Sequence, residues 1–294
     1  MESDVISTLT AKIDSFPTLP IVITRVLEIT TNPESTADDL LKVISIDQSL
    51  TTTILKMANS AFFGLVREVS SLQQALMVLG FTEIRNVVLA KAVFNSFKNL
   101  KKDDKFDIRD FWEHSFTCGL AAKVIALDLK EPCNDFFVAG LIHDIGKLVI
   151  YMTFPMEFYR IIETLGPLRF KSSQEEKNIL GITHDEVGTK LLKRWLFPES
   201  LIAAVGLHHC PHKALEQSLF SVVTYIADLL AHMEKLQDDD EVENSIKNEC
   251  FYPEVVSFFQ SRGLDWNEST LKTFRQKVAE QKENDAGTLS LLLS

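Results

Sequence analysis

The chain has 294 residues, enough for one large or two ordinary domains, and its charged fraction of 24% is that of a folded globular protein. Its 30 Lys and Arg against 41 Asp and Glu leave a net charge of −11, which argues against a generally basic nucleic-acid-binding protein. No signal-peptide pattern, no apolar run near the ~20 residues of a membrane span and no Cys-X-X-Cys pair is evident. We therefore expect a cytoplasmic protein with reduced thiols and no membrane segment.

The N-terminal third of the chain is a succession of amphipathic helical patterns. Apolar residues recur at helical spacing from Ile21 onward. The stretch STADDLLKVISID offers Ser35 or Thr36 as an N-cap, with acidic residues in the first turn. Two further helices are predicted to meet at Gly80, which is placed as a C-cap glycine, and the second of them begins at Thr82.

The helices on either side of Gly80 have the outline of a DNA-reading helix-turn-helix. A reading helix should present several basic or amide side chains to the bases. This one offers Arg85, Asn86 and Lys91 beside Glu83, among valines, leucines and alanines. We interpret the pair as a packed helical hairpin and do not expect nucleic acid as a partner.

Two charged runs divide the chain, KNLKKDDKFD at residues 98–107 and LQDDDEVEN near residue 240. Glycine is scarce and long period-2 alternation is absent, so strands are not expected. We predict an all-α protein. An N-terminal helical bundle, residues 1–105, packs on a metal-binding helical domain, residues 106–232, and an acidic helical extension follows, residues 233–294.

The stretch AGLIHDIGKLVI, residues 139–150, places His143, Asp144 and Lys147 in what should be an apolar helix. A buried charge without a partner is costly, so groups that compensate it should lie nearby. Candidates recur along the chain. His114 follows Asp110 by one helical turn, and His184 follows Thr183 in a capping-box pattern at a helix start.

The remaining candidates lie further along. His208 and His209 are paired at the end of a helix before Pro211, and Asp228 interrupts an apolar helix. Each alone reads as an ordinary core or surface residue. His232, one turn after Asp228, is placed to approach the site, but we interpret it as a solvated helix residue. Together they suffice for two divalent metal ions. The predicted ligands are His114, His143, Asp144, His184, His208, His209 and Asp228, with Asp144 between the ions.

The ligand set contains no thiolate, so it favours borderline to hard ions over soft ones. Iron or manganese is expected first, with nickel or zinc as alternatives. Two cations would compensate the buried carboxylates and favour neutral imidazoles.

These residues follow the ligand order of the HD superfamily of metal-dependent phosphohydrolases, in its HD-GYP-like form. FPTLPIVITRVLEI and SIDQSLTTTILKMANSAFFG, with the later AGLIHDIGKLVIY and HDEVGTKLLKRWLFP, resemble the HDOD family, an HD-related output domain of bacterial signalling proteins. The similarity runs from about Phe16 to about Leu230. The resemblance implies an all-helical fold, no membrane segment and a regulatory role.

The chain departs from the HD-GYP enzymes at two points. After its paired histidines it continues HHCPHKALEQSLFSVV, without the loop of glycine and tyrosine that those enzymes carry. This difference argues against hydrolysis of cyclic di-GMP. Asp110 stands where some of them have a longer glutamate, so a third metal is not expected.

Two functions from different classes follow. The first is a signalling output module whose metal centre is structural or sensory and whose partner is a signalling protein. The second is an active phosphohydrolase or phosphodiesterase on a nucleotide or cyclic dinucleotide, in which Lys147 steadies developing negative charge as the catalytic side chain. The regulator is favoured, because fold and ligands alone do not establish chemistry.

Overall fold

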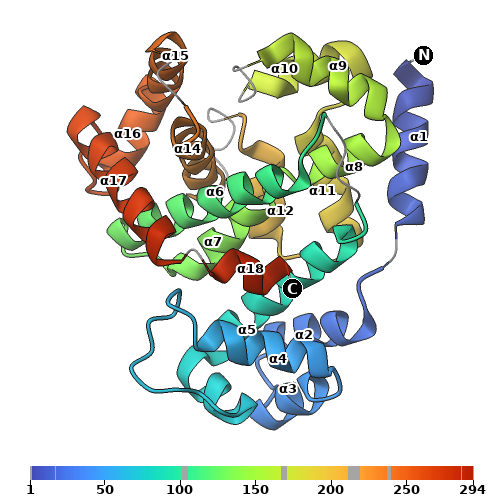
Figure 1. Ribbon diagram of the computed structural model, residues 1–294, viewed down its shortest axis with the longest axis vertical. Helices are drawn as coiled ribbons and strands as arrows, with labels where there is room; N and C mark the ends of the chain where they lie inside the picture. The colour runs from blue at the N-terminus through green and yellow to red at the C-terminus, as the bar shows by residue number, and fades with distance from the viewer. Residues whose placement is uncertain are drawn as a thin grey trace. The chain divides into compact units, whose positions relative to one another are not determined.

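The computed structural model describes residues 2–16, 18–100, 105–166, 171–210, 219–236, 240–285 and 287–293. Within these ranges the regular elements are helices and no strand occurs, which confirms the predicted all-α class (Figure 1). The chain forms two compact units: a larger one of Met1–Phe16 and Lys101–Ala279, and a smaller one of Pro17–Leu100 and Glu280–Ser294. The predicted division at residues 105 and 232 stays a prediction, and its first boundary adjoins residues 101–104, which lie outside the described ranges.

The smaller unit begins with short capped helices. Its helices are α2 (Ile21–Thr31), α3 (Ala37–Ile44), α4 (Gln48–Ala58), α5 (Leu72–Phe97) and α18 (Thr288–Leu293). Thr36, one of the two N-cap residues that the sequence offered, caps α3 in a reciprocal capping box with Asp39. Gly80, with φ of 80°, interrupts α5 at the predicted junction, because this backbone conformation is costly for residues with a Cβ. The amine of Lys91 donates to the carbonyl of Leu292, which ties α18 to α5.

Two of the side chains that a DNA-reading helix would present to bases are not exposed in the second half of α5. Asn86 and Lys91 are both buried. Their burial favours the packed arrangement over a helix-turn-helix, since a reading helix must expose such side chains.

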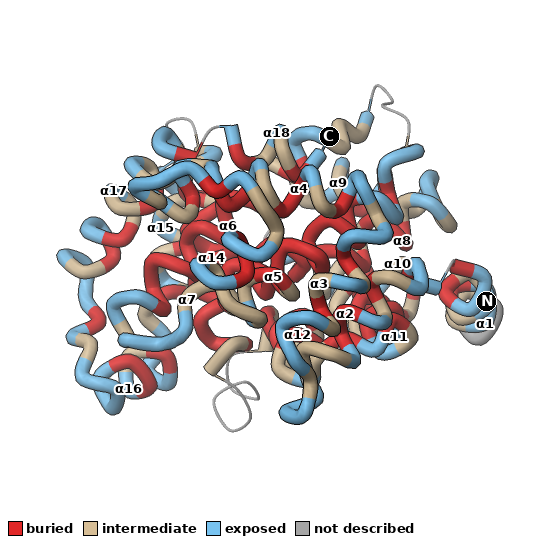
Figure 2. The backbone as a smooth tube through the Cα atoms, turned by 90° about the horizontal axis from the view of Figure 1, so that it is seen from below, coloured by how far each residue is buried: buried red, intermediate tan, exposed pale blue. Residues whose placement is uncertain are grey.

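The larger unit is built around α6 and α14, which are buried on nearly all sides (red in Figure 2). A helix that is apolar all round is typical of the centre of a fold. α6 packs against both α7 and α14. The unit contains α1 (Glu2–Ser15), α6 (Ile108–Asp128), α7 (Cys133–Ile142), α8 (Ile145–Thr153), α9 (Pro155–Leu165), α10 (Ser172–Leu180), α11 (His184–Arg194), α12 (Glu199–Leu207), α14 (Leu219–Met233), α15 (Asp240–Cys250), α16 (Pro253–Ser261) and most of α17 (Glu268–Asn284).

Most of the acidic C-terminal extension, up to Ala279, belongs to the larger unit and contributes to its core. Figure 1 shows α15, α16 and α17 beside α14. Phe259, Trp266 and Phe274 belong to the same buried cluster as Ile125 of α6 and Ile226 of α14. The indole N–H of Trp266 donates to the carbonyl of Cys250 at 2.8 Å, so even the polar end of this large side chain is satisfied.

One stretch differs from the expectation that no apolar run approaches membrane length. By length and composition Cys133–Thr153 could cross a membrane. However, 83% of its apolar window is buried inside the structure, and it contains two helices, α7 and α8. Such burial is typical of a core element of a globular fold.

Candidate metal centre

The sequence indicated that His143 and Asp144 lie within one helix. In the structure they lie at the junction of two helices. His143 is the C-cap of α7 and Asp144 is the N-cap of α8. An N-cap aspartate usually accepts hydrogen bonds from the first turn, whereas Asp144 makes no such bond with its side chain. The break therefore frees a buried carboxylate to turn toward other groups.

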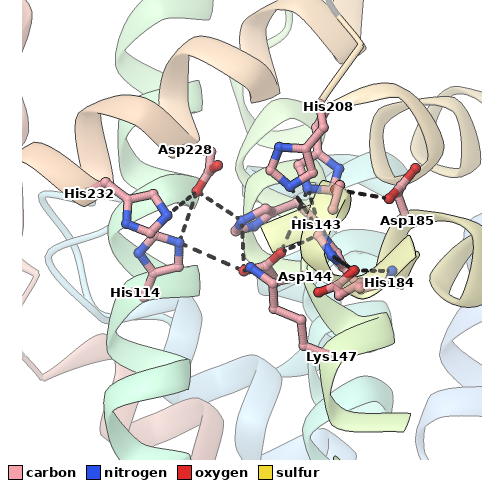
Figure 3. Close-up of polar contacts among 12 residues, drawn as sticks. His114, His143, Asp144, Lys147, His184, Asp185, His208, Asp228 and His232 are labelled. Carbon is pink, nitrogen blue, oxygen red and sulfur yellow. Dashed lines mark hydrogen bonds and ion pairs between the residues drawn. The ribbon is translucent and has the colours of Figure 1, made fainter. Parts of the chain in front are cut away.

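The structure brings all seven predicted ligands together, and Figure 3 labels all of them except His209. They come from α6 (His114), the α7–α8 junction (His143 and Asp144), the first residue of α11 (His184), the end of α12 (His208 and His209) and the middle of α14 (Asp228). All are buried except His209, which is partly exposed. Thr183 caps α11 through a capping box with Glu186, as predicted, and so fixes the start of the helix that carries His184.

A first group of donors surrounds one oxygen of Asp144. Its Oδ1 lies 3.1 Å from Nε2 of His184 and 3.7 Å from Nε2 of His208. Nε2 of His209 lies 3.1 Å from Nε2 of His184. One carboxylate oxygen and three imidazole nitrogens thus fall within 4.8 Å of one another. We call these four residues the first cluster.

A second group surrounds Asp228. Its Oδ1 lies 3.0 Å from Nε2 of His114 and 3.2 Å from Nε2 of His143. The other oxygen of Asp144, Oδ2, lies 3.3 Å from Nε2 of His143 and 3.9 Å from Nε2 of His114. We call His114, His143 and Asp228 the second cluster. Asp144 turns one oxygen toward each cluster, and Figure 3 shows it between them.

Three of the imidazoles form a hydrogen bond through Nδ1, the ring nitrogen that faces away from the clusters. Nδ1 of His143 lies 2.7 Å from the carbonyl of Gly140, and Nδ1 of His208 lies 2.8 Å from the carbonyl of Val205. Nδ1 of His184 lies 2.7 Å from Oε2 of Glu176. Because these partners only accept, each Nδ1 carries the hydrogen. In a neutral ring Nε2 then keeps its lone pair, which is the arrangement of metal-binding histidines.

The Nε2 atoms of these rings converge on one another and on Asp144. Nε2 of His184 lies 3.2 Å from Nε2 of His208, and both rings are fully buried. Nε2 of His143, in a fully buried ring, lies 3.2 Å from Oδ1 of Asp228 and 3.3 Å from Oδ2 of Asp144. Facing lone pairs repel unless a cation lies between them, so this donor set fits divalent metal ions.

Electrostatics at the site indicate competition between protons and metal. Burial lowers the pKa of His184, but the Glu176 carboxylate outweighs this effect and raises it to about 9. Burial lowers the pKa of His209 well below its usual value, since no carboxylate compensates it as closely. Binding of a cation would therefore displace protons from some imidazoles and find others already neutral.

Lys147 lies beside this centre, and its amine is paired with one of the candidate ligands, Asp144. Its amine donates to Oδ2 of Asp144 at 2.8 Å, and only 15% of its side chain is exposed. Burial lowers the pKa of Lys147, but the Asp144 carboxylate outweighs it, and the net pKa is raised above its ordinary value. Lys147 thus supplies a fixed positive charge to the carboxylate between the clusters.

Two residues of the site lie outside the predicted ligand set. Glu176 of α10 is buried and holds both the ring and the backbone N–H of His184 through the same oxygen, at 2.7 Å each. His232, read from sequence as solvated, has a side chain only 16% exposed, with Nε2 3.4 Å from Oδ1 of Asp228. Asp110, by contrast, is exposed and belongs to none of the candidate metal groups among the described residues.

Replacing Glu176 with alanine should weaken metal binding about 10- to 100-fold, because the residues that orient metal-binding histidines contribute on that scale. The loss of the carboxylate also leaves two buried N–H groups of His184 without an acceptor. Competition with a chromophoric chelator would measure the change. Glu175→Ala, one residue away and on the surface side of α10, is the matched control, and equal affinities for the two variants would contradict the role of Glu176.

An all-helical domain that gathers histidines and aspartates from separate helices in this order is the architecture of the HD superfamily. Within it the chain belongs to the HDOD family, whose domain matches residues 16–211. The match stops before α14, which supplies Asp228.

Solved structures share this fold. An HDOD domain protein with unknown function from Geobacter sulfurreducens aligns with a TM-score of 0.74 and 23% identity over 99% of this chain and 100% of that one. A protein from Shewanella amazonensis SB2B named "Putative phosphohydrolase" aligns with a TM-score of 0.72 and 24% identity over 98% of both chains. At these identities the likeness shows the fold.

A curated relative is longer than this chain. An uncharacterized protein from Treponema pallidum (strain Nichols) is 22% identical over 275 residues, which are 92% of this chain and 51% of the relative. The chain thus spans about half the length of the curated relative that it matches.

Proposed function

We propose that this chain is a regulatory HDOD protein of bacterial, cytoplasmic signalling, in which two divalent transition-metal ions, iron or manganese before nickel or zinc, fix the helical scaffold that a partner protein recognises. The observation that carries the proposal is the convergence of imidazoles that are anchored through Nδ1 and aim their Nε2 lone pairs at one another. Such an arrangement is unfavourable without cations and favourable with them.

The two clusters suit one ion each. His184, His208 and His209 with Oδ1 of Asp144 would hold the first ion. His114, His143 and Asp228 with Oδ2 of Asp144 would hold the second. These residues lie on elements far apart in sequence, from α6 to α14, so metal occupancy would set how those helices pack. A change of metal occupancy would then alter the helical surface that the partner protein binds.

A metal-dependent phosphohydrolase acting on a nucleotide or cyclic dinucleotide is the second candidate, and Lys147 is the observation that favours it. A bound metal would supply Lewis acidity and an activated water for phosphate ester cleavage. Lys147 carries a positive charge at the cluster, as a phosphate-binding side chain should. Against this role, its amine already pairs with Asp144 at 2.8 Å, and the metal-facing donors are nearly all buried.

Elemental analysis of protein purified without chelators tests the metal centre, and we expect two transition-metal ions per chain. A folded protein that repeatedly carries no transition metal, and takes up none when manganese or iron is added, would contradict the proposal.

Assays of a generic aryl phosphodiester and of cyclic dinucleotides, with added manganese or iron, separate the two functions. For a regulator we expect no turnover above background in the wild type or in Lys147→Ala, and both proteins should keep their metal. Lys193→Ala, a change of an exposed lysine, is the control. Robust metal-dependent cleavage by the wild type and by Lys193→Ala, abolished in Lys147→Ala, would establish the enzyme instead.

A further inference from the structure

The second cluster has a neighbour that the ligand order of the sequence does not include. His232 follows Asp228 by four residues on α14, so the two side chains lie on one face of the helix. Nε2 of His232 lies 3.4 Å from Oδ1 of Asp228. Its ring centroid lies 4.5 Å from that of His114. Figure 3 shows His232 on the side of His114 and Asp228, away from His184 and His208.

Three imidazoles therefore approach one carboxylate oxygen. Oδ1 of Asp228 lies 3.0 Å from His114, 3.2 Å from His143 and 3.4 Å from His232, each measured to Nε2. His114, Asp228 and His232 also form a group whose donor atoms fall within 4.8 Å of one another. Nε2 of His143, in a fully buried ring, points into this group as well. A single oxygen cannot accept well from three rings at once, whereas a cation can bind all of them.

We propose that His232 is a ligand of the second metal ion and takes one of the coordination positions that a hydrolytic site would leave to water. This inference rests on the proposed metal centre. Without His232 the second ion has His114, His143, Asp228 and one oxygen of Asp144 as protein donors. With His232 it has one more, and metal sites that are filled by protein donors are structural, while catalytic sites keep an open position.

The partial exposure of His232 fits this assignment. Its side chain is 16% exposed, whereas His143 is fully buried, so the ring closes the second cluster at its solvent side. Removing the ring would open the ion to water along this path. A coordination position taken by a ring, and so not available to water, gives a physical reason for a regulatory rather than a hydrolytic centre.

Cobalt(II) loading tests the assignment, because the visible absorption of cobalt reports its ligands. We expect His232→Gly to bind one of its two cobalt ions roughly 10-fold or more weakly and to show altered absorption bands. Added imidazole should restore both, because it can occupy the space of the missing ring. His232→Gln, which keeps most of the side-chain volume, should show the same loss if the glycine variant is unstable. His209→Ala, a change in the first cluster, should alter a different part of the spectrum.

Manganese loading tests the closed position directly. Solvent-proton relaxation should reveal about one additional exchanging water in His232→Gly, since the lost ring leaves one coordination position. Two cobalt ions with wild-type affinity and spectrum in both His232 variants would overturn the inference and leave the metal centre standing. Failure of the wild type to bind cobalt or manganese would overturn both.

Discussion

We expect chelation to lower the melting temperature of the wild-type protein, and Asp144→Ala to remove most of this metal-dependent difference. An ion that binds only the folded state stabilises it by RT ln(1 + [L]/Kd), which is about 2.7 kcal/mol at a free concentration 100 times Kd. For a domain of this size that corresponds to roughly 5–10 °C. Thermal melts with and without saturating manganese, before and after chelation, measure the difference.

Asp144 is the appropriate residue because it serves both clusters, with Oδ1 toward His184 and Oδ2 toward His143. Its replacement also removes a buried charge, so the stability of the metal-free variant can move in either direction. The informative quantity is the shift between the metal-loaded and metal-free protein. Asp110→Ala, which changes an exposed aspartate on α6, should keep the full shift. A full shift in Asp144→Ala would show that the metal binds elsewhere.

The convergence of the seven candidate ligands could be anticipated because each departs from a local rule. Asp228 and His114 are polar side chains in helices that are otherwise buried on nearly all sides. Thr183 and Glu186 mark the start of α11, and this start places His184 at the helix end that faces the cluster. Polar residues that break an apolar pattern are readable from sequence, since burial without partners is costly.

The features that sequence did not reveal depend on tertiary contacts. Glu176 follows the similar Glu175, and only the packing of α10 near α11 buries one and not the other. The break between α7 and α8 was hidden because both flanking helices are apolar, so the hydrophobic pattern continues through it. The acidic extension looked separate by charge, yet residues such as Trp266 lie in the core.

His232 shows why helical spacing alone does not identify a residue of the site. Its spacing of four residues from Asp228 was visible, but the same spacing fits a solvated helix face. Only the ring of His114, which lies 4.5 Å away on α6, distinguishes the two interpretations. Contacts between helices, and not helical periodicity, assign such a residue.

Gly146→Ala should unfold the site by steric conflict and is expected to have the largest effect of any single methyl addition here. Gly146 lies on α8, where a Cβ atom would clash with the carbonyl oxygen of His184 and meet the backbone nitrogen of Gly188 at 2.8 Å. Both contacts are backbone atoms, which cannot rotate aside, so α8 and α11 would have to separate. Overpacking typically costs 1–3 kcal/mol, and we expect roughly 3 kcal/mol or more here.

The same displacement would move the first residue of α11, His184, away from Asp144, so metal binding should fall together with stability. Denaturant unfolding and elemental analysis of the same preparation measure the two losses. Gly188→Ala grades the effect, because its closest contact, at 2.8 Å, is a side-chain carbon of Val205 and can yield. Gly287→Ala, whose Cβ would meet nothing within 4 Å, is the control. If Gly146→Ala kept wild-type stability and metal content, the close approach of α8 and α11 would not be what holds His184 against Asp144.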